Sequence, residues 1–209
     1  MSWQCGNDEM LGDGTAQWRL ATKRPTWHFN GSLAARGISD ADFKRAFTEA
    51  ASRWSDVCDV LWSETSYLSA ATLKVITVSL GGQGGVLADQ TLPNGSPDQQ
   101  LRMRVDITES WSLSEPAPPG KVPLVTVLTH EIGHAHGLVH TDPNNGIPEL
   151  MDPTLGHITH PTGYSVGVVR NLYGPPVIIP PPPPPVPTPD EIAFDSRDGQ
   201  WEIIVRRKP

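Results

Sequence analysis

One short pattern, HExxHxxGxxH, begins at His130 and constrains this chain more than any other segment. It predicts a helix, because His130 and His134 are four residues apart and their rings then lie on the same helix face. Glu131 lies beside them. Gly137 can adopt the left-handed conformation that ends a helix, which turns the chain and brings His140 toward the other two rings. The pattern therefore predicts three imidazoles that converge on one point.

Three neutral imidazoles are typical ligands of zinc, and they leave a fourth position open for water. An open position is the mark of a catalytic zinc rather than a structural one. A carboxylate at Glu131 would lie near that water without replacing it, as a general base must. These residues predict hydrolysis by a zinc-bound water, with His130, His134 and His140 as ligands and Glu131 as the base.

The extended pattern resembles the metzincin zinc endopeptidases, and most closely their matrixin branch, the relatives of the matrix metalloproteinases. Met151, in the segment ELMDP, matches the methionine of the Met-turn beneath the metal. Thr141 stands where matrixins usually carry Ser or Thr. Further likenesses to matrixins lie in residues 81–88, 105–111 and 168–174. The resemblance covers about residues 15–174.

This resemblance implies an α/β (α+β) fold with a mixed, twisted five-stranded sheet, an active-site helix, a Met-turn and a C-terminal helix. It also implies an endopeptidase that binds its protein substrate in an extended form. The expected substrate contacts are Val86, Leu87 and Ala88 on an edge strand, and Pro153, Thr154 and Leu155 on the wall of the S1′ pocket. Leu155 replaces a more usual tyrosine, and an apolar P1′ residue is expected.

Two departures from the matrixin pattern concern metals. Asp89 and Arg104 occupy places where matrixins hold ligands of a second, structural zinc, so one zinc is expected. Asp106 and Glu109 match calcium ligands of the family, and backbone carbonyls of the 81–88 loop could complete an oxygen cage. Gly81, however, stands where an aspartate ligand is usual. A calcium site and an ordinary solvated acidic turn both remain open.

Local patterns predict the other elements. Ser39 reads as a helix cap, and the apolar residues that follow it at helical spacing, Phe43, Phe47, Ala50 and Trp54, predict a core-facing helix. The active-site helix is expected over 123–136 and a last helix over 165–173, with Val166, Val169 and Tyr173 facing inward. Strands are expected at 27–29, 60–63, 73–80, 86–90 and 101–107.

Composition changes abruptly after Gly174. We predict an N-terminal segment at 1–14, a catalytic domain at 15–174, a polyproline linker at 175–189 and a C-terminal tail at 190–209. The proline run predicts a stiff spacer, or else a ligand for an SH3-like groove. The tail reads as a β-hairpin around Asp198 and Gly199. Because a segment of this size cannot form a core, the tail is expected to pack on something else: this domain, a second copy of the chain or a partner.

Cys5 lies ahead of the catalytic domain, where matrixins carry a propeptide cysteine that blocks the zinc. A thiolate at the fourth position would displace the catalytic water. The flanking arginine and proline of the family are missing here. Cys5 is therefore a candidate latency ligand, an ordinary thiol, or the partner of Cys58 in a disulfide.

The net charge of −7 argues against nucleic acid or an anionic membrane surface as a partner. No apolar stretch is long enough to span a bilayer, and no signal peptide is recognisable. The resemblance implies action outside the cell or in association with a particle. Two other functions stay open: a binding or particle-structural module on a metzincin scaffold, and a zinc hydrolase of cell-wall peptides.

Overall fold

The computed structural model describes residues 18–177, 191–197 and 200–206. Its centre is the predicted mixed, five-stranded sheet, in the order β2-β1-β3-β5-β4. The strands are β1 (Thr26–Asn30), β2 (Ser63–Glu64), β3 (Leu73–Val78), β4 (Ala88–Gln90) and β5 (Leu101–Asp106). Only β4 runs antiparallel to its neighbour, and it forms one edge of the sheet.

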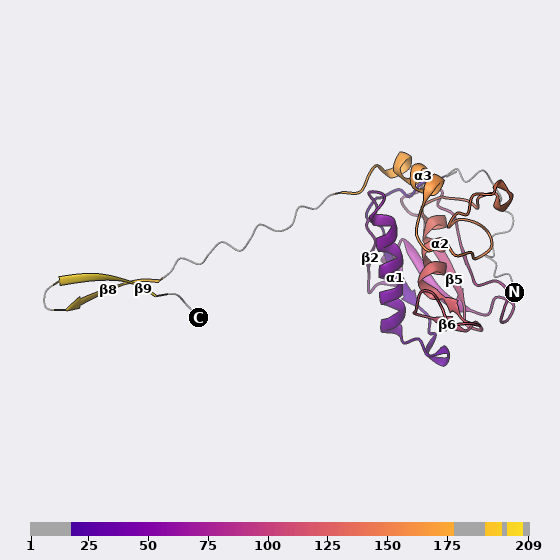
Figure 1. The fold of residues 1–209 in the computed structure, drawn as a ribbon. Coiled ribbons are helices and arrows are strands. Elements are labelled where there is room, and N and C mark those ends of the chain that lie inside the picture. The colour runs from indigo at the N-terminus through magenta and orange to yellow at the C-terminus, as the bar shows by residue number, and fades with distance from the viewer. Residues whose placement is uncertain (1–17, 178–190, 198–199, 207–209) are drawn as a thin grey trace. The chain divides into compact units, whose positions relative to one another are not determined.

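Three α-helices accompany the sheet: α1 (Asp40–Ser55), α2 (Leu124–Ala135) and α3 (Gly163–Tyr173). Helices α1 and α2 lie side by side, and α3 lies near their C-terminal ends (Figure 1). The Ser39 hydroxyl accepts a hydrogen bond from the Asp42 amide and caps α1 as predicted. Helix α2 begins and ends within one residue of the expected bounds.

The core joins α1 to the sheet through aromatic stacking. Phe47 stacks on Trp27 with ring centroids 4.1 Å apart, and Phe43 stacks on Phe29 at 4.0 Å. Both helix residues belong to the apolar stripe predicted for α1, and both are fully buried. Aromatic pairs of this kind contribute about 0.5–1.5 kcal/mol each beyond the area that they bury.

Shorter elements connect these parts. They are the 3-10 helices η2 (Ala34–Arg36), η3 (Leu68–Ala70) and η4 (Pro143–Asn145), and the parallel strand pair β6 (Trp111–Ser112) and β7 (Val122–Pro123). A separate unit holds the antiparallel strands β8 (Glu191–Arg197) and β9 (Gln200–Arg206).

The strand predicted at 60–63 is wrong in its extent, since β2 begins only at Ser63. The amides of Leu61 and Ser63 do donate to the carbonyls of Lys23 and Pro25. Pro25 has no amide hydrogen to return such a bond, so regular pairing starts at Thr26. The predicted strands at 73–80 and 86–90 are likewise shorter in the structure.

Helix α3 starts two residues earlier than predicted, and Ser165 rather than Val166 faces inward at its start. The cause is Glu149, whose buried carboxylate accepts hydrogen bonds from the Tyr164 amide (3.0 Å) and the Ser165 hydroxyl (3.2 Å). A carboxylate suits this position because the first amides of a helix lack backbone partners and carry partial positive charge.

Tyr173, at the end of α3, is buried and connects three segments. Its hydroxyl donates to the carbonyl of His136 (2.8 Å) and accepts from the amide of Leu20 (2.9 Å). The start of the described chain is thereby fixed to the end of α2.

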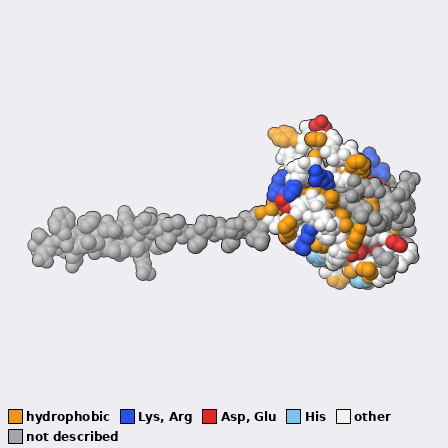
Figure 2. Space-filling model, turned by 90° about the horizontal axis from the view of Figure 1, so that it is seen from above, with side chains coloured by type: hydrophobic (Ala, Val, Ile, Leu, Met, Phe, Trp, Pro, Cys, Tyr) orange, Lys and Arg blue, Asp and Glu red, His pale blue; other side chains and the backbone are white. Residues whose placement is uncertain are grey.

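The surface carries no single continuous field of charge on the face shown in Figure 2, where basic side chains lie in small groups among neutral and apolar ones. Large exposed apolar side chains are scattered, with Tyr67 and Ile147 the most exposed. Within the described residues, no helix has the length and apolarity needed to cross a bilayer.

Candidate metal centre and active site

The three histidines of the sequence pattern meet at one point. The Nε2 atoms of His130 and His134 lie 3.1 Å apart, and that of His140 lies 3.3 Å from the first and 3.2 Å from the second. Tetrahedral zinc with bonds of about 2.0–2.1 Å places its ligand nitrogens about 3.3–3.4 Å apart. The triangle therefore has the size that one zinc ion requires.

The surroundings fix which ring nitrogen is available. The Nδ1 atom of His130 lies 2.7 Å from the carbonyl oxygen of Leu150. The Nδ1 atom of His134 lies 2.8 Å from the carbonyl oxygen of Leu138. A carbonyl only accepts, so each Nδ1 carries the proton and each Nε2 keeps its lone pair for a metal. Burial lowers the pKa of His130 to about 4, and that of His140 to about 3. Both rings are thus neutral at pH 7, as metal ligands must be.

Gly137 makes the turn that delivers His140. Helix α2 ends at Ala135, and Gly137 follows with a φ of 92°, in the left-handed region. A methyl group added at Gly137 would also overlap the carbonyl oxygen of Trp18, and it would lie 2.9 Å from the carbonyl carbon of Trp18. Glycine is thus required twice, by conformation and by the close approach of another backbone segment.

Met151 lies in a turn that packs against α2, the helix that carries His130 and His134. A methyl group on Gly133 of α2 would overlap the Met151 sulfur and lie 2.9 Å from Trp54 Cζ2. The amide of Thr141 donates to the Met151 carbonyl (3.0 Å), and its hydroxyl donates to Asp152 (2.5 Å). The turn that holds Met151 therefore packs directly on the helix that carries His130 and His134.

Glu131 and His130 share the wall of one pocket, which extends to the segment that follows Met151. The other lining residues are Leu87, Val127, Asp152, Pro153 and Leu155. Of the predicted substrate contacts, this pocket includes Leu87, Pro153 and Leu155, while Val86, Ala88 and Thr154 lie outside its lining. Below, residues 152–162 are called the pocket loop.

The sequence interpretation missed Val127 and Asp152. Val127 lies three and four residues before His130 and Glu131, so helix periodicity alone places it on their face. Asp152 directly follows Met151 and could have been expected near the site for that reason. His136 is a packing residue: it is fully buried, and its Nε2 accepts a hydrogen bond from Trp62 Nε1 (3.0 Å).

Asp106 and Glu109 are both fully buried, and each has one oxygen, Oδ2 and Oε2, without a hydrogen-bond partner among the described residues. Burial and the nearby Asp106 raise the pKa of Glu109. The amide of Gly84, in the 81–88 loop, donates to Glu109 Oε1 (2.6 Å). Two buried carboxylates with unused oxygens are an unfavourable arrangement in the protein alone, and they fit a cation that prefers oxygen ligands.

Asp89 and Arg104 form an ion pair between the edge strand β4 and its neighbour β5. The guanidinium Nε contacts both carboxylate oxygens, at 2.8 and 3.0 Å, and a further contact comes from Nη2. Of the two cysteines, Cys58 is fully buried, and burial raises the pKa of its thiol to about 12. Cys5, the candidate latency ligand, lies outside the described residues.

Known proteins similar to this chain are metalloproteinases. The model of the matrixin family of peptidases matches residues 17–166. "Metalloendoproteinase 1-MMP" of Arabidopsis thaliana is 31% identical over 180 residues, which are 77% of this chain and 48% of that protein. "Metalloendoproteinase 1" of Glycine max is 26% identical, over 76% of this chain and 53% of its own length.

"Matrix metalloproteinase-16" of Rattus norvegicus is 29% identical over 72% of this chain, but the match covers 27% of that protein. The chain therefore spans about half the length of the two plant relatives, and less of the animal one.

Proposed function

Because this chain belongs to the matrixin family, we propose that it is a zinc-dependent endopeptidase that hydrolyses peptide bonds of extended protein substrates. The observation that carries the proposal is the triangle of Nε2 atoms, 3.1–3.3 Å on each side, with Glu131 in the wall of the adjoining pocket. Hydrolysis needs both features together, a metal ligand set with an open position and a carboxylate beside it.

His130, His134 and His140 would hold the zinc. When bound, zinc supplies a Lewis acid that polarises a carbonyl and acidifies a water molecule. Glu131 takes the proton from the attacking water and passes it to the leaving amine. Its near-complete burial, at 1% exposure, keeps this proton transfer away from bulk solvent. Met151 and the carbonyls of Leu138 and Leu150 hold the ligands in position.

The substrate would bind as an added strand along β4, because β4 forms an edge of the sheet and an edge strand can pair with one further strand. Leu87 precedes this strand and lines the pocket, so a peptide paired there would run past the histidines. The P1′ side chain would enter the pocket between Val127 and Leu155. Both walls are apolar, which favours an apolar P1′ residue.

A peptidase assay with a metal measurement tests this proposal. Glu131→Gln should lower kcat/KM by about 1,000-fold or more and leave one zinc per chain, because the carboxylate is the base and not a ligand. Glu64→Gln, at an exposed glutamate, is the matched control and should leave both unchanged. A chelator should abolish wild-type cleavage. Zinc-loaded, folded protein that cleaves no protein or peptide would refute the proposal.

We also propose that Asp106 and Glu109 hold a calcium ion together with carbonyls of the 81–88 loop. Their unused buried oxygens support this proposal. Calcium should then raise the melting temperature of the wild type and have no effect on Glu109→Gln. An equal effect of calcium on both proteins would contradict it.

Zinc stoichiometry is proposed to be one per chain. The contacts of Arg104 with both Asp89 oxygens support this, because a guanidinium already neutralises that carboxylate.

A further inference from the structure

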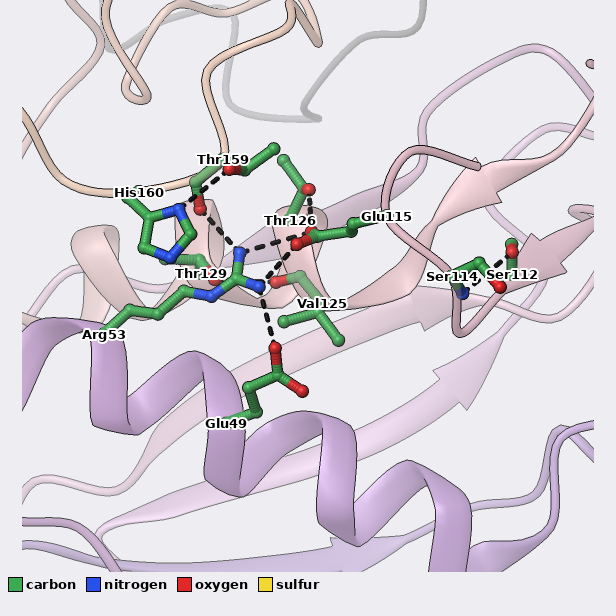
Figure 3. A network of polar contacts seen from close by, with 10 residues as sticks. All are labelled: Glu49, Arg53, Ser112, Ser114, Glu115, Val125, Thr126, Thr129, Thr159 and His160. Carbon is green, nitrogen blue, oxygen red and sulfur yellow. Dashed lines mark hydrogen bonds and ion pairs between the residues drawn. The ribbon is translucent and has the colours of Figure 1, made fainter. Parts of the chain in front are cut away.

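Arg53, near the end of α1, joins segments that are far apart in the chain (Figure 3). Its side chain is 6% exposed. Nη1 donates to the carbonyl oxygen of Thr159 in the pocket loop (2.6 Å) and to Glu115 Oε1 (3.2 Å). Nη2 donates to Glu115 Oε2 and to Glu49 (2.9 Å). A buried guanidinium with this many acceptors is held in one position, unlike the guanidinium of a surface ion pair.

Glu115 extends this contact to the active-site helix. Its Oε1 also accepts from the hydroxyl of Thr126, in the first turn of α2. Burial alone would raise the pKa of Glu115, but the hydrogen bonds from Arg53 and Thr126 keep this pKa below its usual value. One ionised carboxylate thus links α1, α2 and the segment between β6 and β7.

Both ends of this network are close in sequence to residues that line the pocket. Thr126 directly precedes Val127, which lines one wall, and Thr159 lies four residues after Leu155, which lines the other. Among the loop and turn backbone–backbone hydrogen bonds of the described chain, none involves residues 156–161. The bond from Arg53 to the Thr159 carbonyl is therefore a principal polar restraint on this half of the pocket loop.

We infer that Arg53, Glu115, Thr126 and the Thr159 carbonyl form a brace that positions the pocket loop against α2 and so determines which P1′ side chains the pocket accepts. Arg53 and Glu115 do not line the pocket, so they are positioning residues. The link to P1′ rests on the proposed peptidase function, whereas the mechanical role of the brace does not.

A shift of the loop changes the distance between the Leu155 wall and the Val127 wall. Pockets discriminate apolar side chains through their size, and one methylene changes kcat/KM by about 10–200-fold. Loosening the brace should therefore change the ratio between small and large P1′ residues more than it changes turnover of the best substrate.

The experiment compares Arg53→Lys and Glu115→Gln with two controls. Arg53→Lys keeps the charge but loses the fork that reaches several acceptors at once. Arg45→Lys, on the same helix with a side chain 75% exposed, controls for the substitution itself. Glu49→Gln removes the charge of an exposed carboxylate that contacts Arg53 from within α1. Each protein is studied as the full, zinc-loaded chain.

Two measurements are made. Hydrogen–deuterium exchange should become about tenfold faster at the hydrogen-bonded amides at the two ends of the pocket loop, Asp152 and Tyr164, in Arg53→Lys and Glu115→Gln. It should stay unchanged in the sheet and in both controls. The ratio of kcat/KM for Leu over Phe at P1′ should change about five- to tenfold in the same two variants, with one zinc per chain retained.

Unchanged exchange in the loop of both variants would overturn the inference, and so would faster exchange spread equally over the whole domain. Faster loop exchange with an unchanged P1′ ratio would refute the specificity role. If the wild type cleaves no peptide, the peptidase proposal fails, while the exchange measurement still decides whether the brace exists.

Discussion

The metal centre and the Arg53 brace are both buried polar clusters, but they are assembled in different ways. The three histidines come from one short stretch, and helix periodicity with one glycine turn brings them together. The brace joins residues separated by 62 and 106 positions, and it exists only when the whole domain is folded. The comparison teaches that the chemistry of this site is encoded locally, while the shape of its pocket is a tertiary property.

The largest effect on this comparison should come from Gly137→Ala. The left-handed φ and the overlap with the Trp18 carbonyl together should lower the free energy of unfolding by roughly 3 kcal/mol or more, and zinc should be lost. Gly120→Ala is the matched control, since Gly120 has a φ of 77° and open space at the added methyl. For both variants, chemical denaturation measures the free energy of unfolding and a metal analysis measures the zinc content. Equal losses in the two variants would show that the Trp18 contact is unimportant.

The next largest effect concerns the packing of Met151 against Gly133 of α2. Gly133→Ala should destabilise the domain by about 1–3 kcal/mol, because the methyl would overlap the Met151 sulfur, although alanine favours a helix. Gly167→Ala, in α3 with open space around it, should stabilise by about 0.5–1 kcal/mol. Thermal unfolding distinguishes the two. A stabilising Gly133→Ala would mean that the Met-turn can move away at little cost.

A smaller effect, dependent on pH, tests the brace. The pKa of Glu115 is lowered in the folded protein, so its contribution to stability is present above the unfolded pKa, about 4.3, and is lost as pH falls through the folded value. Glu115→Gln should therefore be less stable than the wild type at pH 7, and the two should converge in acid. The free energy of unfolding of both proteins is measured between pH 3 and 7, at steps of about half a pH unit. A difference between the two proteins that stays constant over this range would contradict the linkage.

The smallest effect is expected at the surface of α1. Arg45 pairs with Asp42 through a side chain that is 75% exposed, and such pairs contribute about 0–1 kcal/mol. Arg45→Ala should thus change the free energy of unfolding by no more than about 0.5 kcal/mol. A loss as large as that of Arg53→Lys would remove the distinction between a buried brace and an ordinary exposed ion pair.

The predictable parts of the fold follow from short-range rules. The helix period placed His130, His134 and the stripe of α1, and it could also have placed Val127. The extent of β2 was not predictable, because it depends on Pro25 lying beside residues 60–63. Arg53 borders the apolar stripe of α1, which suggests partial burial, but no local pattern identifies Glu115 or Thr159 as its partners.

The hydroxyl of Tyr173 has a practical consequence for anyone who trims this protein. This hydroxyl connects Leu20 to His136, just before the turn that leads to His140. A shortened protein should therefore include both Leu20 and Tyr173 if it is to bind zinc as the full chain does. Shortened versions should begin no later than Trp18 and extend at least to Gly174, and those cut inside these limits should bind zinc less tightly even though every ligand is still present.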